Sequence, residues 1–236
     1  MSSSKRLRKT HTKFGGGKTI NNKEAKQHDK DVGKIANKKA MEIIKSKYPN
    51  LSFVHKPKIT KEEMCERLKQ IDPVFGTHQH KKGTRIRGDG GYWFVVDKCG
   101  KERLVLATEA KKQGTNDIRL LEGKKKQSSG NAVERAHKNI TEIQNWMCDE
   151  VYFPYVMFCT GCDFAEECSI PDRLTGLTGQ RPLNRLYVRN KRMGLQFLQS
   201  PSIFIKVHKW GVDEMAEIMI QAVEEALCIL STELPN

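Results

Sequence analysis

The sequence has no long hydrophobic run and no apolar segment behind its basic start. The longest strongly apolar run, residues 92–96, is far too short to span a bilayer, and residues 1–9 are not followed by the hydrophobic core of a signal peptide. We therefore expect no membrane association and a cytoplasmic protein.

Cysteine is present without the pattern of a disulfide framework. The seven cysteines are an odd number scattered through apparent core segments, which favours reduced, buried thiols. Cys159, Cys162 and Cys168 have a spacing that suggests zinc as an alternative, but no fourth ligand has an obvious place nearby. We expect no structural disulfide.

Acidic residues are few compared with basic ones. The chain has 42 Lys and Arg against 28 Asp and Glu, a formal net charge of +14, and the basic residues recur along the whole sequence. A polyanionic partner is therefore expected, although charge alone does not distinguish DNA, RNA and an anionic membrane.

The length of 236 residues suits one substantial domain with tails. Residues 1–22 are rich in Lys, Arg, Ser, Thr and Gly with almost nothing to bury, so they predict a flexible cationic arm. Residues 23–236 are then one domain.

Helical and strand-like patterns alternate along that domain. Apolar residues at helical spacing, a capping box at residues 60–63 and short apolar runs mark the elements. We expect helices from residue 25 to before 48, from 61 to 71, from 131 to 147 and from 212 to 227, and strands at 92–96, 104–108, 155–158 and 203–207. The order predicts an α/β domain with a mixed sheet, in which the first two strands form a hairpin.

Three charged residues of that hairpin suggest a metal-dependent active site. Asp89 is followed, after nineteen intervening residues, by Glu109 and Lys111, and alternation along a strand places Glu109 and Lys111 on one face. If the turn is centred on Cys99, residue 89 lies opposite residue 109. Two adjacent carboxylates repel each other unless a cation neutralises them, and an oxygen-only cluster suits Mg²⁺. The chemistry this predicts is phosphodiester hydrolysis.

A second constellation opens the helix expected from residue 131. Asn131, Glu134 and Arg135 lie at i, i+3 and i+4, hence on one face of a helix start that is able to enter a groove. An Asn amide can bond the N6/N7 edge of adenine, and Glu134 can orient Arg135 or accept a hydrogen bond from an exocyclic amine.

Both constellations carry a resemblance to a known family. Residues 87–91 (Arg-Gly-Asp-Gly-Gly) with 107–114 (Ala-Thr-Glu-Ala-Lys-Lys-Gln-Gly) resemble the site of the PD-(D/E)xK nucleases, and residues 130–140 (Gly-Asn-Ala-Val-Glu-Arg-Ala-His-Lys-Asn-Ile) are similar to the base-reading segment of EcoRI-type restriction endonucleases. Weaker matches extend from about residue 25 to the C-terminus. Gly88 stands where the family has proline.

The resemblance implies a restriction-endonuclease-like fold, with a central mixed five-stranded sheet flanked by helices. It implies that Asp89, Glu109 and the main-chain carbonyl of Ala110 hold Mg²⁺, and that Lys111 completes the catalytic site. It also assigns DNA binding to seven residues, namely Gly130, Asn131, Ala132, Glu134, Arg135, Lys138 and Arg185.

The implied activity is that of a type II restriction endonuclease that cuts double-stranded DNA at a palindrome with an AATT core. GAATTC is the favoured site, while a degenerate outer pair or bare AATT stays open, because Val188 and Gln127 replace family residues near the outer bases. A palindrome implies a two-fold symmetric homodimer. The family also implies a companion adenine methyltransferase.

Two alternatives remain open on the residues alone. A non-catalytic DNA- or RNA-binding protein would use the basic surface but would not need Asp89, Glu109 and Lys111 together. A junction or repair nuclease of the same fold would keep the metal site without reading AATT.

Overall fold

The computed structural model describes residues 27, 30–112, 131–161, 164, 170–193 and 196–235. The expected arm, residues 1–22, lies outside the described residues. The elements follow in the order η1 (Asp31–Ala36, a π-helix), α3 (Asn37–Lys47), β1 (Phe53–Lys56), β2 (Ile59–Thr60), α4 (Lys61–Ile71), β3 (Arg85–Ile86), β4 (Gly91–Val96), β5 (Glu102–Lys112), α6 (Asn131–Trp146), β6 (Tyr155–Thr160), α7 (Ile170–Leu177), β7 (Lys191–Met193), β8 (Gln196–Leu198), β9 (Ser202–Lys206) and α8 (Val212–Ile229).

A mixed sheet of five strands forms the centre, in the order β1-β4-β5-β6-β9. The strands β1, β4 and β5 pair antiparallel, whereas β5, β6 and β9 pair parallel. This confirms the expected α/β fold with a five-stranded mixed sheet. The shorter pairs β2–β3 and β7–β8 stand apart from it.

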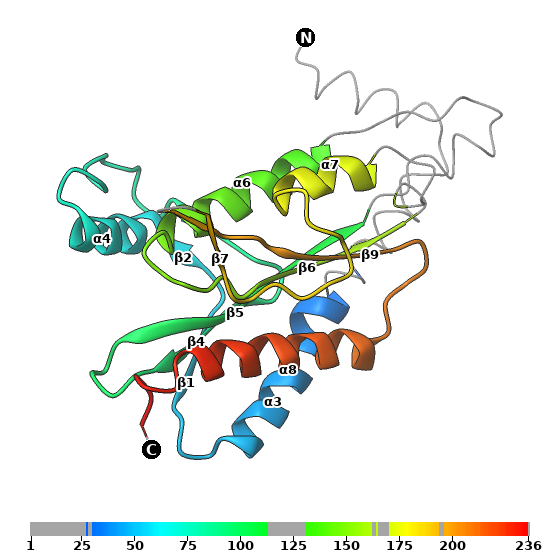
Figure 1. Ribbon diagram of the computed structural model, residues 1–236, viewed down its shortest axis with the longest axis horizontal. Coiled ribbons are helices and arrows are strands. Elements are labelled where there is room, and N and C mark those ends of the chain that lie inside the picture. The colour runs from blue at the N-terminus through cyan, green and yellow to red at the C-terminus, as the bar shows by residue number, and fades with distance from the viewer. Residues whose placement is uncertain are drawn as a thin grey trace, which may run out of the picture.

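Helices cover both faces of this sheet. Figure 1 shows α6 and α7 on one side and α3 with α8 on the other, while α4 lies beyond the C-terminal end of α6. A parallel strand that helices cover on both faces has no solvent-exposed face, and every residue of β6 is accordingly buried. The apolar run in β5 is buried for the same reason, so the strand that carries Glu109 crosses the middle of the core.

The sequence pattern predicted both ends of α4 correctly. Thr60 accepts a hydrogen bond from the Glu63 backbone at 3.2 Å, and the Glu63 carboxylate accepts one from the Thr60 backbone at 2.7 Å, which is the capping box expected there. The helix ends at Ile71, before Asp72 and Pro73.

The first helical segment differs from the expected pattern. Its initial turns are the π-helix η1, so the buried positions recur every four residues, at Val32, Ala36, Ala40 and Ile44. Ile35 and Ile43, two apolar residues whose spacing helped to predict this helix, are by contrast 46% and 42% exposed. In the described parts of the chain, no helix is long and apolar enough to cross a membrane.

Candidate active site

The loop that carries Asp89 leads directly into β4 and lies against β5. The Asp89 carboxylate accepts a hydrogen bond from the Ala110 backbone N–H at 2.9 Å, and Gly90 N–H lies 3.3 Å from the Thr108 carbonyl oxygen. The predicted pairing of residue 89 with residue 109 is therefore wrong by one position. A bulge between Trp93 and Phe94 shifts the hairpin register, so Val96 pairs with Glu102 but Gly91 pairs with Thr108.

The structure brings Asp89, Glu109 and Lys111 together. Glu109 and Lys111 lie in β5, which is longer than the expected strand, and the Lys111 ammonium contacts the Glu109 carboxylate directly. The same ammonium lies 3.9 Å from an Asp89 carboxylate oxygen. Glu109 is 2% exposed, whereas the Asp89 side chain is 31% exposed, so one carboxylate lies in the core and the other opens to solvent.

Two further side chains hold Glu109, and neither was given a role from the sequence. The Asn139 amide lies 3.2 and 3.3 Å from the two carboxylate oxygens, and the Tyr155 hydroxyl lies 3.5 Å from one of them. Asn139 is eight residues after Asn131 and four after Arg135, so helical spacing could have indicated it. Tyr155 gives no such signal, because its contact depends on the pairing of β5 with β6.

Burial makes this carboxylate hard to ionise without a cation. Desolvation raises the pKa of Glu109 to about 7. The negative charge of Asp89 also raises this pKa, and the positive charge of Lys111 lowers it in part. Burial lowers the pKa of Lys111, but Glu109 and Asp89 outweigh it and the net pKa is raised, so the amine stays charged. The site therefore stabilises positive charge between two carboxylates.

The donor atoms of this site fit a hard divalent cation. Asp89, Glu109 and the Ala110 carbonyl offer oxygen only, which is the set that Mg²⁺ prefers. Within the described residues no group of three or more His, Cys, Asp or Glu side chains is placed to hold a metal.

The cysteines give no second metal centre among the described residues. Cys159 is 1% exposed, and burial raises the pKa of its thiol to about 12, which favours the neutral form over a zinc-binding thiolate. Cys162 and Cys168 lie outside the described residues.

Helix α6 contacts this site at Asn139, and its preceding turn is exposed. Glu134, Arg135 and Lys138 are exposed, and Arg135 lies one helical turn before Asn139, which contacts Glu109. Asn131 and Ala132 begin the helix, but their side chains, like Gly130 as a whole, lie outside what the structure describes.

Arg185 is exposed in the segment between α7 and β7, next to Asn184, whose side chain accepts a hydrogen bond from the Ile205 backbone at 2.7 Å. In the described parts of the chain, no hydrogen bond or ion pair joins Arg185 to Asp89, Glu109 or Lys111.

Comparison with known proteins decides the family. The family model for restriction endonuclease EcoRI matches residues 14–171. The chain is 35% identical to the type II restriction enzyme EcoRI of Escherichia coli, over 98% of this chain and 95% of that protein. It is 32% identical to the type II restriction enzyme RsrI of Cereibacter sphaeroides, over 93% of this chain and 91% of that protein.

The chain belongs to the EcoRI family of restriction endonucleases. Membership agrees with the mixed five-stranded sheet described above. Within this EcoRI-family fold, Asp89, Glu109 and Lys111 form one cluster that contacts Asn139 of α6, and the similarity of residues 87–91 and 107–114 to the nuclease motif led us to expect these three side chains together.

Proposed function

We propose that this protein is a type II restriction endonuclease that cleaves double-stranded DNA at GAATTC, a palindrome with an AATT core, by Mg²⁺-dependent phosphodiester hydrolysis. The observation that carries this proposal is the Lys111 ammonium lying between Asp89 and the buried Glu109, which is in turn bound by Asn139 of α6. A positive centre held in that way suits attack on a phosphate.

Asp89, Glu109 and the Ala110 carbonyl would hold the metal. When bound, Mg²⁺ polarises the scissile phosphate and lowers the pKa of a bound water. Lys111 stabilises negative charge that develops on the phosphate, because its ammonium is fixed in a mostly buried position. Asn139 and Tyr155 orient the Glu109 carboxylate through their hydrogen bonds.

Sequence reading belongs to α6 in this proposal. Asn131, Ala132, Glu134 and Arg135 read the central bases from the major groove, since they stand in the first turns of α6, and Gly130, which precedes them in the sequence, is assigned to DNA binding with them. Lys138 and Arg185 add exposed positive charge, and the net charge of +14 supports binding to DNA phosphates.

The assembly follows from the symmetry of the DNA site. A palindrome requires two copies of the reading segment and two active sites, so we propose a homodimer. We also propose that residues 23–236 act as one endonuclease domain with a cationic arm at 1–22, that the protein is cytoplasmic, and that an adenine methyltransferase protects host DNA.

Plasmid digestion tests the proposed function. Purified protein is incubated with a plasmid holding one GAATTC and with a matched plasmid holding one altered central base pair, each with Mg²⁺ or with a chelator. We expect cleavage of the first plasmid only, and only with Mg²⁺, and sequencing of the ends gives the cut position. Sequence-specific binding without cleavage would instead indicate a regulator, and cleavage of branched DNA without sequence preference would indicate a junction nuclease.

Arg135→Ala should damage discrimination more than affinity for random DNA. Loss of a bidentate base contact costs about 1–3 kcal/mol of specificity, which is roughly a factor of five to a hundred and fifty in the ratio of specific to random binding. Lys138→Ala is the matched control on the same exposed helix face, and it should weaken both kinds of binding alike. Equal losses for both variants on both DNAs, measured without metal by fluorescence anisotropy, would contradict the reading role of Arg135.

A further inference from the structure

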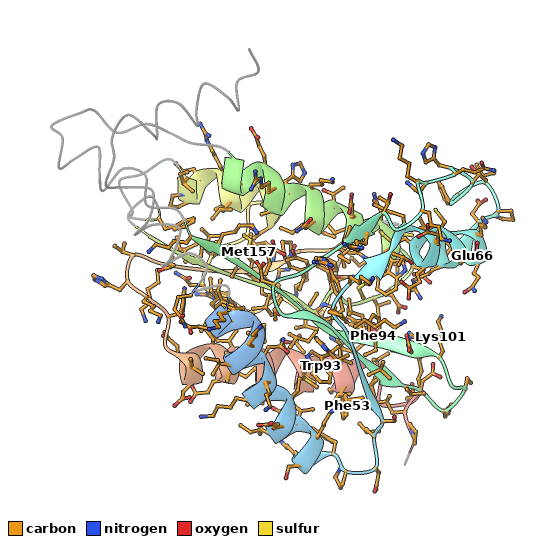
Figure 2. All side chains as sticks on the ribbon, turned by 180° about the vertical axis from the view of Figure 1, so that it is seen from behind. Phe53, Glu66, Trp93, Phe94, Lys101 and Met157 are labelled. Carbon is orange, nitrogen blue, oxygen red and sulfur yellow. The ribbon has the colours of Figure 1, made fainter. Side chains whose placement is uncertain are left out.

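A buried amide lies beneath the loop that carries Asp89. Asn37, the first residue of α3, is 2% exposed; its side-chain oxygen accepts a hydrogen bond from the Trp93 indole at 2.6 Å, and its nitrogen donates to the Thr108 hydroxyl at 3.2 Å. An indole N–H only donates, so the Trp93 contact fixes the orientation of the amide. Trp93 projects from β4 on the side of the sheet that α3 covers (Figure 2).

Alternation along β5 connects this amide to the active site. Thr108 faces α3 and contacts Asn37, whereas the next residue, Glu109, faces α6 and contacts Asn139. The two successive residues are therefore anchored from opposite layers of the fold.

A second anchor comes from β1. The His55 Nε2 atom lies 3.1 Å from the Gly90 carbonyl oxygen, and because a carbonyl only accepts, this nitrogen carries the hydrogen. His55 pairs with Trp93 across the strands, and their ring centroids lie 4.6 Å apart. The ring is thus held beside the loop by its stacking on Trp93.

The loop has no room for side chains where it meets these anchors. A Cβ atom at Gly90 would lie 1.7 Å from the Thr108 hydroxyl oxygen and 2.8 Å from the Asn37 amide nitrogen. A Cβ atom at Gly88 would lie 2.7 Å from the Thr108 carbonyl oxygen, so the position where the family has proline cannot hold a ring here without a shift. A glycine leaves φ free, whereas proline fixes it.

We propose that Asn37 and His55 are positioning residues that hold loop 88–91, and with it the Asp89 carboxylate, in place of the rigidity that a proline at position 88 would supply. The proposal rests on the proposed role of Asp89 in DNA cleavage. Asn37 acts through Thr108, on which Gly90 packs, and His55 acts through the Gly90 carbonyl. If both residues hold the loop, they preserve the hydrogen bond that the Ala110 amide donates to the Asp89 carboxylate, so this amide reports on their effect.

The test compares variants that remove one anchor each. His55→Phe keeps a ring on Trp93 and loses the N–H donor, whereas His55→Gln keeps an N–H donor; Asn37→Leu removes both hydrogen bonds at similar volume. Thr60→Ala, which removes the side-chain cap of α4 and no hydrogen bond of Asn37 or His55, is the control for a general loss of stability. The readouts are hydrogen exchange at the Ala110 amide without DNA or metal, kcat on GAATTC DNA, and Kd for that DNA without metal.

We expect faster exchange at Ala110 and a lower kcat at nearly unchanged Kd. In His55→Phe the exchange rate at Ala110 should rise about fivefold and kcat should fall about fivefold, whereas His55→Gln should stay close to the parent in both. In Asn37→Leu kcat should fall about a hundredfold, as expected when a catalytic group is misplaced. Ala110 exchange equal to the parent's in His55→Phe would overturn the proposal, as would a fall in kcat that Thr60→Ala reproduces. If the parent cleaves no DNA, the proposed function fails, and the exchange data still decide whether the anchors hold the loop. His55 is exposed, so its variants keep the test valid even if Asn37→Leu does not fold.

Discussion

Replacing Glu109 with glutamine should abolish DNA cleavage and at the same time stabilise the metal-free protein at pH 8. Cleavage falls by at least about a thousandfold, because a neutral amide is a much poorer ligand for a divalent cation than a carboxylate. Binding to GAATTC without metal should persist, since base reading is assigned to α6 and not to β5. A nicking assay and a binding titration check the two statements separately.

The gain in stability follows from the pKa of Glu109. In the folded protein burial raises this pKa from 4.5 to about 7, so the folded state holds a proton that the unfolded state has released between those two values. Stability of the metal-free parent therefore falls as the pH rises from about 4.5 to about 7, and the penalty is fully present above that window. It amounts to at most about 3 kcal/mol, and glutamine removes it.

The measurement is urea unfolding of metal-free protein at pH 5 and pH 8. Glu109→Gln should exceed the parent clearly at pH 8 and by little at pH 5. Glu217→Gln, a change at an exposed glutamate of α8, is the matched control and should alter stability by less than about 0.5 kcal/mol at either pH. A Glu109→Gln protein less stable than the parent at pH 8 would contradict the described burial of an unneutralised carboxylate.

The sequence predicted those parts of the site that depend on local periodicity. Glu109 and Lys111 share a face because they are two apart in a strand, and the start of α6 was visible in its helical spacing. The mixed sheet was predictable from the alternation of elements, although β1 gave too short a pattern to be recognised. Local rules therefore gave the elements and the direction in which their side chains point.

The remaining features depend on contacts between distant segments. The bulge at Trp93 and Phe94 shifts the strand register by one residue, and no glycine or other turn residue at this position predicts it. These two neighbours point to opposite layers: Trp93 bonds Asn37 of α3, while the Phe94 ring packs against Trp146 of α6 at a centroid distance of 5.8 Å. Packing in both layers therefore determines where the extra residue is accommodated, and a single strand's sequence does not show that.

Replacing Lys111 with methionine should have the opposite effect on stability from Glu109→Gln. The ammonium is the cation that lies beside Asp89 and Glu109, and methionine keeps much of its apolar length while removing the charge. At pH 8 the loss of the ammonium should cost about 1–2 kcal/mol, because Glu109 takes up a proton when it would otherwise remain buried, charged and unpaired. Cleavage should fall by about a hundredfold or more, because charge at the phosphate is no longer stabilised.

The loss in Lys111→Met should depend on pH and on Glu109. Without Lys111 the pKa of Glu109 rises further, so the deficit is large at pH 8 and shrinks at pH 5, where the carboxyl group is protonated in parent and variant alike. In a Glu109→Gln background the same Lys111→Met change should cost less than about 1 kcal/mol, because the buried charge that needed the ammonium is gone. Urea unfolding of the four proteins at pH 8 measures this cycle. Equal costs in the two backgrounds would mean that Lys111 supports the fold by packing alone, and the cation-holding site on which the hydrolysis depends would lose its electrostatic basis.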